Sequence, residues 1–226
     1  MTGPSPSPSP LAAVEAAPPE AQAVFGPRMP QAIAYVDLLA DAGVERGLIG
    51  PRERPRLWTR HVLNSAAIVP ALPASPDLRV VDVGSGAGLP GIPLVLARPD
   101  LRMTLLEPLA RRTAFLEEAA RDLALDVEVL RGRAEEVREP RWDVVVARAV
   151  APLEQLLALA ARLVQGGGML LAVKGQTAGD EIAAAAEPIR RASTRPAEIL
   201  TFGDGAASAT VVRVLLDRPQ PRGKVR

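Results

Sequence analysis

Short apolar runs alternate with amphipathic stretches through residues 77–217. The apolar runs predict five strands, at Arg79–Val83, Met103–Glu107, Val127–Arg131, Trp142–Ala147 and Met169–Lys174. Between these runs, apolar residues recur every three or four positions, which is typical of helices packed on one side. Nearly continuous apolar strands that alternate with helices indicate a parallel sheet covered on both faces.

The chain on either side of this pattern looks different. Upstream, apolar residues at helical spacing predict two helices within residues 31–43 and 57–69. Downstream, Glu198–Phe202 and Thr210–Leu216 predict a closing pair of strands around a glycine-containing turn. The predicted fold class is therefore α/β, with a mostly parallel doubly wound sheet and a small helical N-terminal extension.

Four segments follow from these patterns. Repeated Ser-Pro pairs and further prolines in residues 1–28 predict a disordered tail, because proline removes helix hydrogen-bond donors. Residues 29–76 are expected to form the helical extension, residues 77–217 the main domain and residues 218–226 a basic tail. No stretch is long and apolar enough to span a membrane, and no targeting signal is recognisable, so we expect a cytoplasmic protein.

The composition excludes several kinds of catalytic and metal-binding site. The 226 residues include no cysteine and one histidine, His61. A disulfide framework, a cysteine-ligated metal site and a thiolate nucleophile are excluded, and a lone histidine argues against a catalytic triad or a metal centre. Arginine supplies nearly all of the 27 basic residues. The arginine-rich stretch in residues 46–60 and the basic tail are candidate contacts for RNA phosphates.

The most informative segment is Asp82–Gly91, DVGSGAGLPG, which follows the first predicted strand and opens a helix. In a doubly wound sheet this turn is the usual ligand cradle, and glycine lets the backbone approach a ligand closely. Its last three glycines, Gly86, Gly88 and Gly91, satisfy the dinucleotide pattern G-x-G-x-x-G. Its first three glycines, together with Asp82, instead satisfy the S-adenosylmethionine (AdoMet) pattern of an acid followed by G-x-G-x-G.

Charge favours AdoMet over a dinucleotide. A pyrophosphate binds backbone amides at a helix N-terminus without a carboxylate beside them, yet Asp82 lies two residues before Gly84. AdoMet carries an ammonium and a sulfonium, which a carboxylate stabilises. Glu107, at the end of the second strand, can accept hydrogen bonds from the ribose hydroxyls of either cofactor. An NAD(P)-dependent oxidoreductase and a non-catalytic nucleotide-responsive binding module remain the alternatives.

The ends of the later strands restrict the methyl acceptor. Methylation at pyrimidine C5 needs a cysteine adduct, and the loop ARAVAP at 147–152 lacks the Asn/Asp-Pro-Pro-aromatic signature of amine methylation. Guanine N7 has a free lone pair, so positioning and desolvation can drive direct in-line transfer without a covalent intermediate. Arg148 is the candidate for contacting cofactor or base, and Arg60, His61 and Lys174 are candidate substrate contacts.

Six segments, in this order and spacing, resemble a known family. They are RHVLNS (60–65), VVDVGSGAGLPGIPLVL (80–96), TLLEPLARRTAFL (104–116), GRAEEV (132–137), ARAVAPL (147–153) and LLAVKG (170–175). Together they are similar to the bacterial small-subunit ribosomal RNA guanine-N7 methyltransferase family, also called glucose-inhibited division protein B. The block GAGLPGIP with RHVLNS upstream is far more specific than a glycine motif alone.

The resemblance implies an AdoMet-dependent enzyme with a Rossmann-like class I methyltransferase fold. It implies that Gly84 and Leu89 line the AdoMet pocket, that Glu107 holds the ribose, and that Ala134 and Glu135 flank the adenine.

The same resemblance implies the partner. The expected substrate is a guanine in the 530 loop of 16S rRNA, presented by the small ribosomal subunit or by an assembly intermediate. Arg148 is then placed at the mouth of the cofactor and substrate sites. We expect a monomer with no obligate protein partner.

Overall fold

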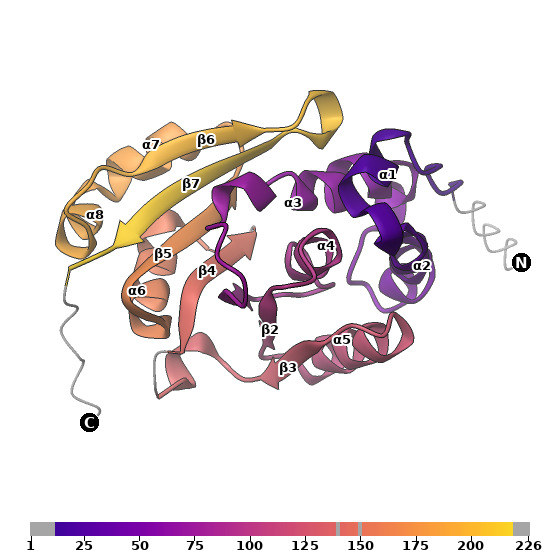
Figure 1. Cartoon of the computed structure of the whole chain (residues 1–226), viewed down its shortest axis with the longest axis horizontal. Coiled ribbons are helices and arrows are strands. Elements are labelled where there is room, and N and C mark those ends of the chain that lie inside the picture. The colour runs from indigo at the N-terminus through magenta and orange to yellow at the C-terminus, as the bar shows by residue number, and fades with distance from the viewer. Residues whose placement is uncertain (1–11, 139–140, 149–150, 219–226) are drawn as a thin grey trace, which may run out of the picture.

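The computed structural model describes residues 12–138, 141–148 and 151–218, and a seven-stranded sheet forms the centre of this part (Figure 1). The strand order is β3-β2-β1-β4-β5-β7-β6. The strands are β1 Arg79–Val83, β2 Arg102–Glu107, β3 Val127–Arg131, β4 Trp142–Arg148, β5 Val164–Lys174, β6 Glu198–Phe202 and β7 Ala209–Leu216. The first five are parallel and β7 runs antiparallel to β5 and β6. The predicted mostly parallel sheet is confirmed.

Helices cover both faces of the sheet. They are α1 Glu20–Phe25, α2 Met29–Leu38, α3 Asn64–Ala66, α4 Gly91–Ala97, α5 Ala110–Asp122, α6 Leu153–Leu163, α7 Ala178–Ala184 and α8 Ala186–Ala192. Figure 1 shows α1–α4 gathered on one side and α6–α8 on the other, and each group packs on its own apolar core. Wider turns at Leu39–Gly43 and Leu57–Leu63 continue α2 and lead into α3. Within the described residues, no helix is long and apolar enough to cross a membrane.

Successive strand residues point to opposite faces, and this alternation decides which strand-end side chains can meet. Val80 of β1 lies in the core shared with α1–α4, and Val81 lies in the core under α6–α8. The same alternation places Asp82 and Arg148 on the α1–α4 face. Lys174 falls on the α6–α8 face, because the preceding Val173 packs with α1–α4.

The predicted disordered tail of residues 1–28 is wrong over its last part, where α1 forms. Ala21 and Phe25 are buried, and the Phe25 ring lies 6.4 Å, centroid to centroid, from that of Trp58. Pro19 stands at the N-cap of α1, where a missing N–H leaves no helix hydrogen bond unmade. A short helix can therefore form between prolines when its apolar side chains pack into a hydrophobic core.

Both chain ends extend past the described part. Residues 1–11 of the predicted tail and residues 219–226 of the predicted basic tail lie outside the described residues. Arg218, the first residue of that basic segment, is described. Its backbone N–H donates to Ala192 O at 3.2 Å, and its Nε donates to Ser193 O at 3.0 Å. Arg218 thus holds the end of β7 against the end of α8.

Candidate active site

The turn after β1 is a glycine bend, defined here as Gly84–Gly88. Gly84, Gly86 and Gly88 have φ values of 70°, 60° and 92°, in the left-handed region that glycine adopts without strain. A Cβ on Gly88 would lie 2.5 Å from Ile92 Cδ1, whereas a Cβ on Gly86 would meet nothing closer than 3.8 Å. The bend therefore packs against α4 at one end and leaves room at Gly86.

Gly91, which begins α4, allows this helix to approach the sheet closely. A Cβ there would lie 2.4 Å from Leu105 Cδ2 and 2.9 Å from Asp82 Oδ2.

We expect Gly91→Ala to lower the free energy of unfolding by about 3 kcal/mol, because both neighbours are buried and cannot move apart. Urea unfolding measures this loss. Gly179→Ala is the matched control, since a Cβ in α7 meets nothing within 4 Å, and we expect it to be neutral or slightly stabilising. Equal effects from both variants would contradict this packing argument.

Asp82, at the end of β1, is a buried carboxylate beneath the bend. Its Oδ2 accepts a hydrogen bond from the Gly91 backbone N–H at 3.0 Å, and its Oδ1 has no partner among the described residues. Burial raises the pKa of Asp82 to about 7, and the nearby Glu107 adds to the increase. A buried acceptor without a partner is unfavourable, so Asp82 would be stabilised by a cationic or hydrogen-bond-donating ligand at this position.

Glu107, at the end of β2, closes the other side of the bend. Its Oε2 accepts from the Gly86 N–H at 3.0 Å, its Oε1 accepts from the Leu109 N–H at 3.0 Å, and its side chain is buried. Arg112 Nη1 lies 3.8 Å from Oε2. An ionised carboxylate has about four acceptor positions, so Glu107 can hold the bend and still accept from a ligand.

The end of β3 lies beside Glu107, because the Gly132 N–H donates to Glu107 O at 3.3 Å. A short 3-10 turn at Ala134–Glu136 follows, in which Ala134 is buried and Glu135 is exposed. The structure therefore brings the predicted cofactor residues of the first three strands to one edge of the sheet. Leu89, just after the bend, is partly buried against the same core as α4.

Arg148, the last residue of β4, extends to the helical extension. Its Nη1 donates to Ser65 Oγ at 2.7 Å and to His61 O at 3.2 Å. Its Nη2 donates to Arg60 O at 3.0 Å and lies 3.3 Å from His61 Nδ1. Arg148 and Asp82 lie on the same face of the sheet, and the Arg148 charge lowers the pKa of Asp82, against the larger effect of burial.

His61 lies between Arg148 and an acid. Its Nε2 is 2.8 Å from Glu53 Oε2, and only 13% of its side chain is exposed. Burial lowers the pKa of His61, and the charges of Arg148 and Arg60 act in the same direction against Glu53. Arg60 itself is largely exposed, 3.8 Å from the Glu53 carboxylate.

Lys174 is separated from the other predicted site residues. It ends β5 on the opposite face, where its Nζ contacts Glu181 Oε2 at 2.7 Å and Ala151 O at 2.8 Å. Glu181 Oε2 also accepts from the Leu153 N–H at 2.9 Å. Lys174 therefore joins the start of α6 to α7 and does not line the glycine bend.

Tyr35, in α2, is a site residue that sequence reasoning missed. Its hydroxyl donates to Ala87 O, in the glycine bend, at 2.8 Å, and the side chain is fully buried. Burial raises the pKa of Tyr35. It is the chain's single tyrosine and lies on an apolar helix face, so the sequence pattern indicates only a core residue. The role of its hydroxyl follows only from the structure, in which the extension packs on the glycine bend.

We expect Tyr35→Phe to lower the free energy of unfolding by about 1–3 kcal/mol, because Ala87 O would be left buried without its donor. Thermal or urea unfolding measures the loss. Ile33→Ala serves as a control in the same helix, because Ile33 is 43% exposed and should contribute little. A Tyr35→Phe protein as stable as the wild type would show that this hydrogen bond does not hold the bend.

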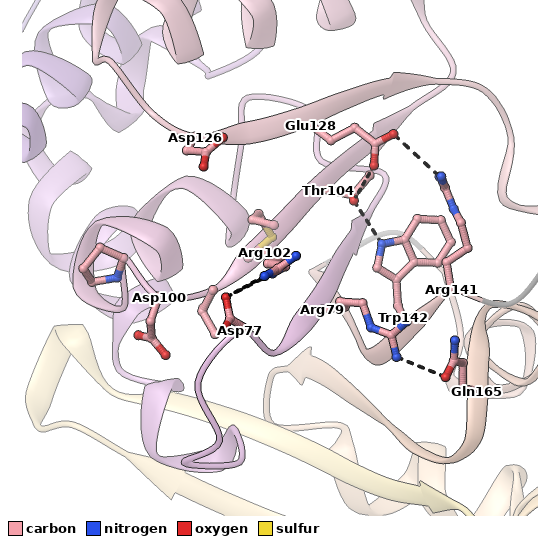
Figure 2. Close-up of a pocket in the computed structure, with 13 residues that line it drawn as sticks. Asp77, Arg79, Asp100, Arg102, Thr104, Asp126, Glu128, Arg141, Trp142 and Gln165 are labelled. Atoms are coloured by element: carbon pink, nitrogen blue, oxygen red, sulfur yellow. Dashed lines mark hydrogen bonds and ion pairs between the residues drawn. The ribbon is translucent and has the colours of Figure 1, made fainter.

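A pocket also lies at the opposite edge of the sheet, where the strands begin (Figure 2). Its volume is about 860 Å³. Figure 2 shows its polar groups bonded to one another: Arg102 pairs with Asp77, and Thr104 donates to Glu128 and accepts from the Trp142 indole. Ligands of doubly wound sheets bind at the carboxyl ends of the strands, so this pocket is not the candidate site.

The fold and the site together define the class of protein. A doubly wound sheet with this strand order, carrying a carboxylate-flanked glycine bend, is a class I methyltransferase fold. A crystal structure of a methyltransferase from Pyrococcus furiosus is similar to it with a TM-score of 0.55 and 13% identity, over 69% of this chain and 83% of that one. At that identity the likeness concerns the fold alone.

Sequence relatives identify the family. The model of the family described as rRNA small subunit methyltransferase G matches residues 28–210. Ribosomal RNA small subunit methyltransferase G of Kineococcus radiotolerans is 55% identical over 217 residues, 93% of this chain and 84% of the relative. The protein of the same name from Pseudarthrobacter chlorophenolicus is 50% identical over 89% of this chain and 94% of the relative. The chain belongs to the rRNA small subunit methyltransferase G family and is a methyltransferase, which confirms the resemblance carried by RHVLNS and GAGLPGIP.

Proposed function

We propose that this methyltransferase transfers a methyl group from AdoMet to N7 of a guanine in 16S rRNA. The observation that carries the proposal is the buried Asp82 beneath the glycine bend, with Oδ1 unpartnered and Glu107 opposite. Arg148 comes to the same edge and face of the sheet from β4. AdoMet, when bound, supplies a methyl group made electrophilic by its sulfonium.

The bend suits a cationic ligand better than a dinucleotide. Asp82 and Glu107 are both buried, so a pyrophosphate placed between them would meet two acidic groups at low effective dielectric. The AdoMet ammonium would instead stabilise the ionised form of Asp82 and give Oδ1 a donor. The two buried carboxylates beside the bend therefore disfavour an NAD(P)-dependent oxidoreductase.

The other predicted contacts are compatible with the adenosine end of AdoMet. Glu107 has acceptor capacity left for the ribose hydroxyls. Ala134 and Glu135 follow β3 next to Glu107, where they would flank the adenine, and Leu89 follows the bend.

The site favours a methyl acceptor whose nucleophilic atom carries no proton, so that no base is needed. The chain has no cysteine, and both ring nitrogens of His61 already face protein groups. Guanine N7 attacks with its own lone pair, so positioning is sufficient. The Arg148 Nη groups contact the helical extension, whereas no described residue accepts from its Nε–H. That donor is available for an oxygen on the base, and O6 lies next to N7 in guanine.

Two arginines of the arginine-rich stretch are engaged within the protein and are therefore weaker candidates for RNA contact. Arg46 pairs with Glu118 at 2.6 Å, and Arg54 donates to the Ala12 and Ala40 carbonyls. Arg46 therefore ties the extension to α5 of the main domain, and Arg54 joins segments within the N-terminal part of the chain. We propose that RNA contacts fall to the exposed arginines of the stretch, among them Arg60, whose backbone carbonyl accepts a hydrogen bond from Arg148. We propose that the protein acts as a monomer in the cytoplasm.

Transfer of tritium from labelled AdoMet tests the proposal. 16S rRNA from a strain lacking the protein should be labelled, and wild-type 16S rRNA should not, because its target is already methylated. Nucleoside mass spectrometry should identify the product as 7-methylguanosine. Equal labelling of both RNAs, or a product methylated elsewhere, would contradict the proposal. Binding of AdoMet with no product would favour the non-catalytic module.

A further inference from the structure

We propose that His61, held by Glu53, is a positioning residue that fixes the Arg148 guanidinium for methyl transfer. The helical extension would then position an active-site side chain in addition to packing on the sheet. The inference rests on the proposed role of Arg148 in the methyl-transfer site.

Arg148 is held almost entirely from one short segment of the extension. Its two Nη groups reach Ser65 Oγ, the carbonyls of Arg60 and His61, and His61 Nδ1, at 2.7 to 3.3 Å. The two carbonyls belong to the wide turn Leu57–Leu63 that leads into α3. Wide turns of this kind are frequent at functional sites.

The His61 ring is the one titratable member of this set, and Glu53 decides its tautomer. With Nε2 2.8 Å from Glu53 Oε2, the proton of the neutral ring lies on Nε2, which donates to the carboxylate. Nδ1 then keeps its lone pair and accepts from Arg148 Nη2. In the other tautomer, an N–H of His61 would face an N–H of Arg148.

The surroundings of Glu53 keep its carboxylate in place. Arg56 Nη2 donates to Glu53 Oε1 at 2.8 Å, and Arg60 Nε lies 3.8 Å from Oε2. The hydrogen bond from His61 and these two arginines outweigh burial and lower the pKa of Glu53. Glu53 therefore stays ionised and continues to orient His61.

A direct role in proton transfer or RNA contact fits His61 less well. Both ring nitrogens are engaged, and little of the side chain is exposed. Methylation at N7 also leaves no proton for a base to remove. What remains for the ring is to hold Arg148 in one orientation.

This arrangement predicts a loss of activity in acid. The charged groups that face His61 are Glu53, Arg60 and Arg148. Protonation of Nδ1 replaces its lone pair by an N–H and sets a cation against Arg148. Burial lowers the pKa of His61, so the neutral form persists at neutral pH and the rate should fall only as the pH drops below the usual histidine range.

Matched variants of the full-length protein separate positioning from a merely structural role. His61→Asn can place an amide oxygen near the position of Nδ1 without a titrating ring, and His61→Gln places its amide nearer to Nε2. We expect His61→Gln to lower kcat about tenfold or more, and His61→Asn to lower it less. Neither should change the KM for AdoMet. At saturating AdoMet, which keeps Asp82 ionised, the acid decrease in kcat should disappear in His61→Asn.

Glu53→Gln provides a second measurement that does not alter the ring. Loss of the carboxylate charge lowers the His61 pKa further, so the acid decrease should move to lower pH. An unmoved decrease in Glu53→Gln, equal kcat values for the two His61 variants, or parallel loss of AdoMet binding would overturn the inference. Wild-type methylation of 16S rRNA, measured in the same assay, tests the proposed function separately. If the wild type methylates and the variants behave alike, only the role of His61 fails.

Discussion

Replacement of Arg148 by alanine is expected to lower kcat for methyl transfer by about 100-fold to 1,000-fold. This is the range for removing one preorganised donor from an active site. Arg148→Lys should recover little, because a lysine ammonium cannot make the four contacts of the two Nη groups to the extension. Steady-state kinetics with 16S rRNA from a deletion strain measure both variants.

Arg102→Ala provides the control for Arg148→Ala. Arg102 begins β2 at the opposite edge of the sheet, its side chain is 68% exposed, and it pairs with Asp77. Its removal should leave kcat at the wild-type value. Similar rates for Arg148→Ala and Arg102→Ala would show that Arg148 does not act in the transfer step.

Asp82→Asn is expected to weaken AdoMet binding at least about tenfold and to stabilise the ligand-free protein above pH 7. The folded-state pKa of about 7 exceeds the ordinary 3.8, so the folded wild type binds this proton more tightly than the unfolded chain. Its stability therefore decreases as the pH rises from about 4 to about 7. Ionisation of the buried carboxylate costs on the order of 4 kcal/mol, and part of that should be recovered in Asp82→Asn.

Urea unfolding at pH 5 and pH 8, with calorimetric titration of AdoMet, checks both halves of this prediction. The stability difference between Asp82→Asn and wild type should be positive at pH 8 and absent or reversed at pH 5. Asp143→Asn should show the opposite sign at pH 8, because hydrogen bonds from Arg79 lower the pKa of Asp143. An Asp82→Asn protein that binds AdoMet normally would contradict the role of Asp82.

The strands and the glycine bend were predictable because their signals are local. Apolar runs of five or six residues define β1 to β4 almost to the residue. β5 begins at Val164, five residues before the predicted start at Met169. The prediction missed these residues because the glycines at 166–168 resemble a turn in sequence. A Cβ on Gly168 would lie 2.7 Å from Asp143 O, so glycine serves close strand approach there.

The residues that the sequence did not reveal depend on contacts between distant segments. Tyr35 and Ala87 are 52 positions apart, and Arg148 and Ser65 are 83 apart. Lys174 was predicted near the site from its position at a strand end. Strands buried on both faces carry no polar alternation in sequence, so the side to which Lys174 points became clear only from the packing of Val173.

A crystal structure of the protein grown with equal concentrations of AdoMet and NADH would show which cofactor the glycine bend holds. We predict AdoMet in the glycine bend, with its ammonium end beside Asp82, its ribose on Glu107 and its methyl group toward Arg148. A bend that is empty, or one that holds the nicotinamide dinucleotide, would show that Asp82 and Glu107 do not form an AdoMet site.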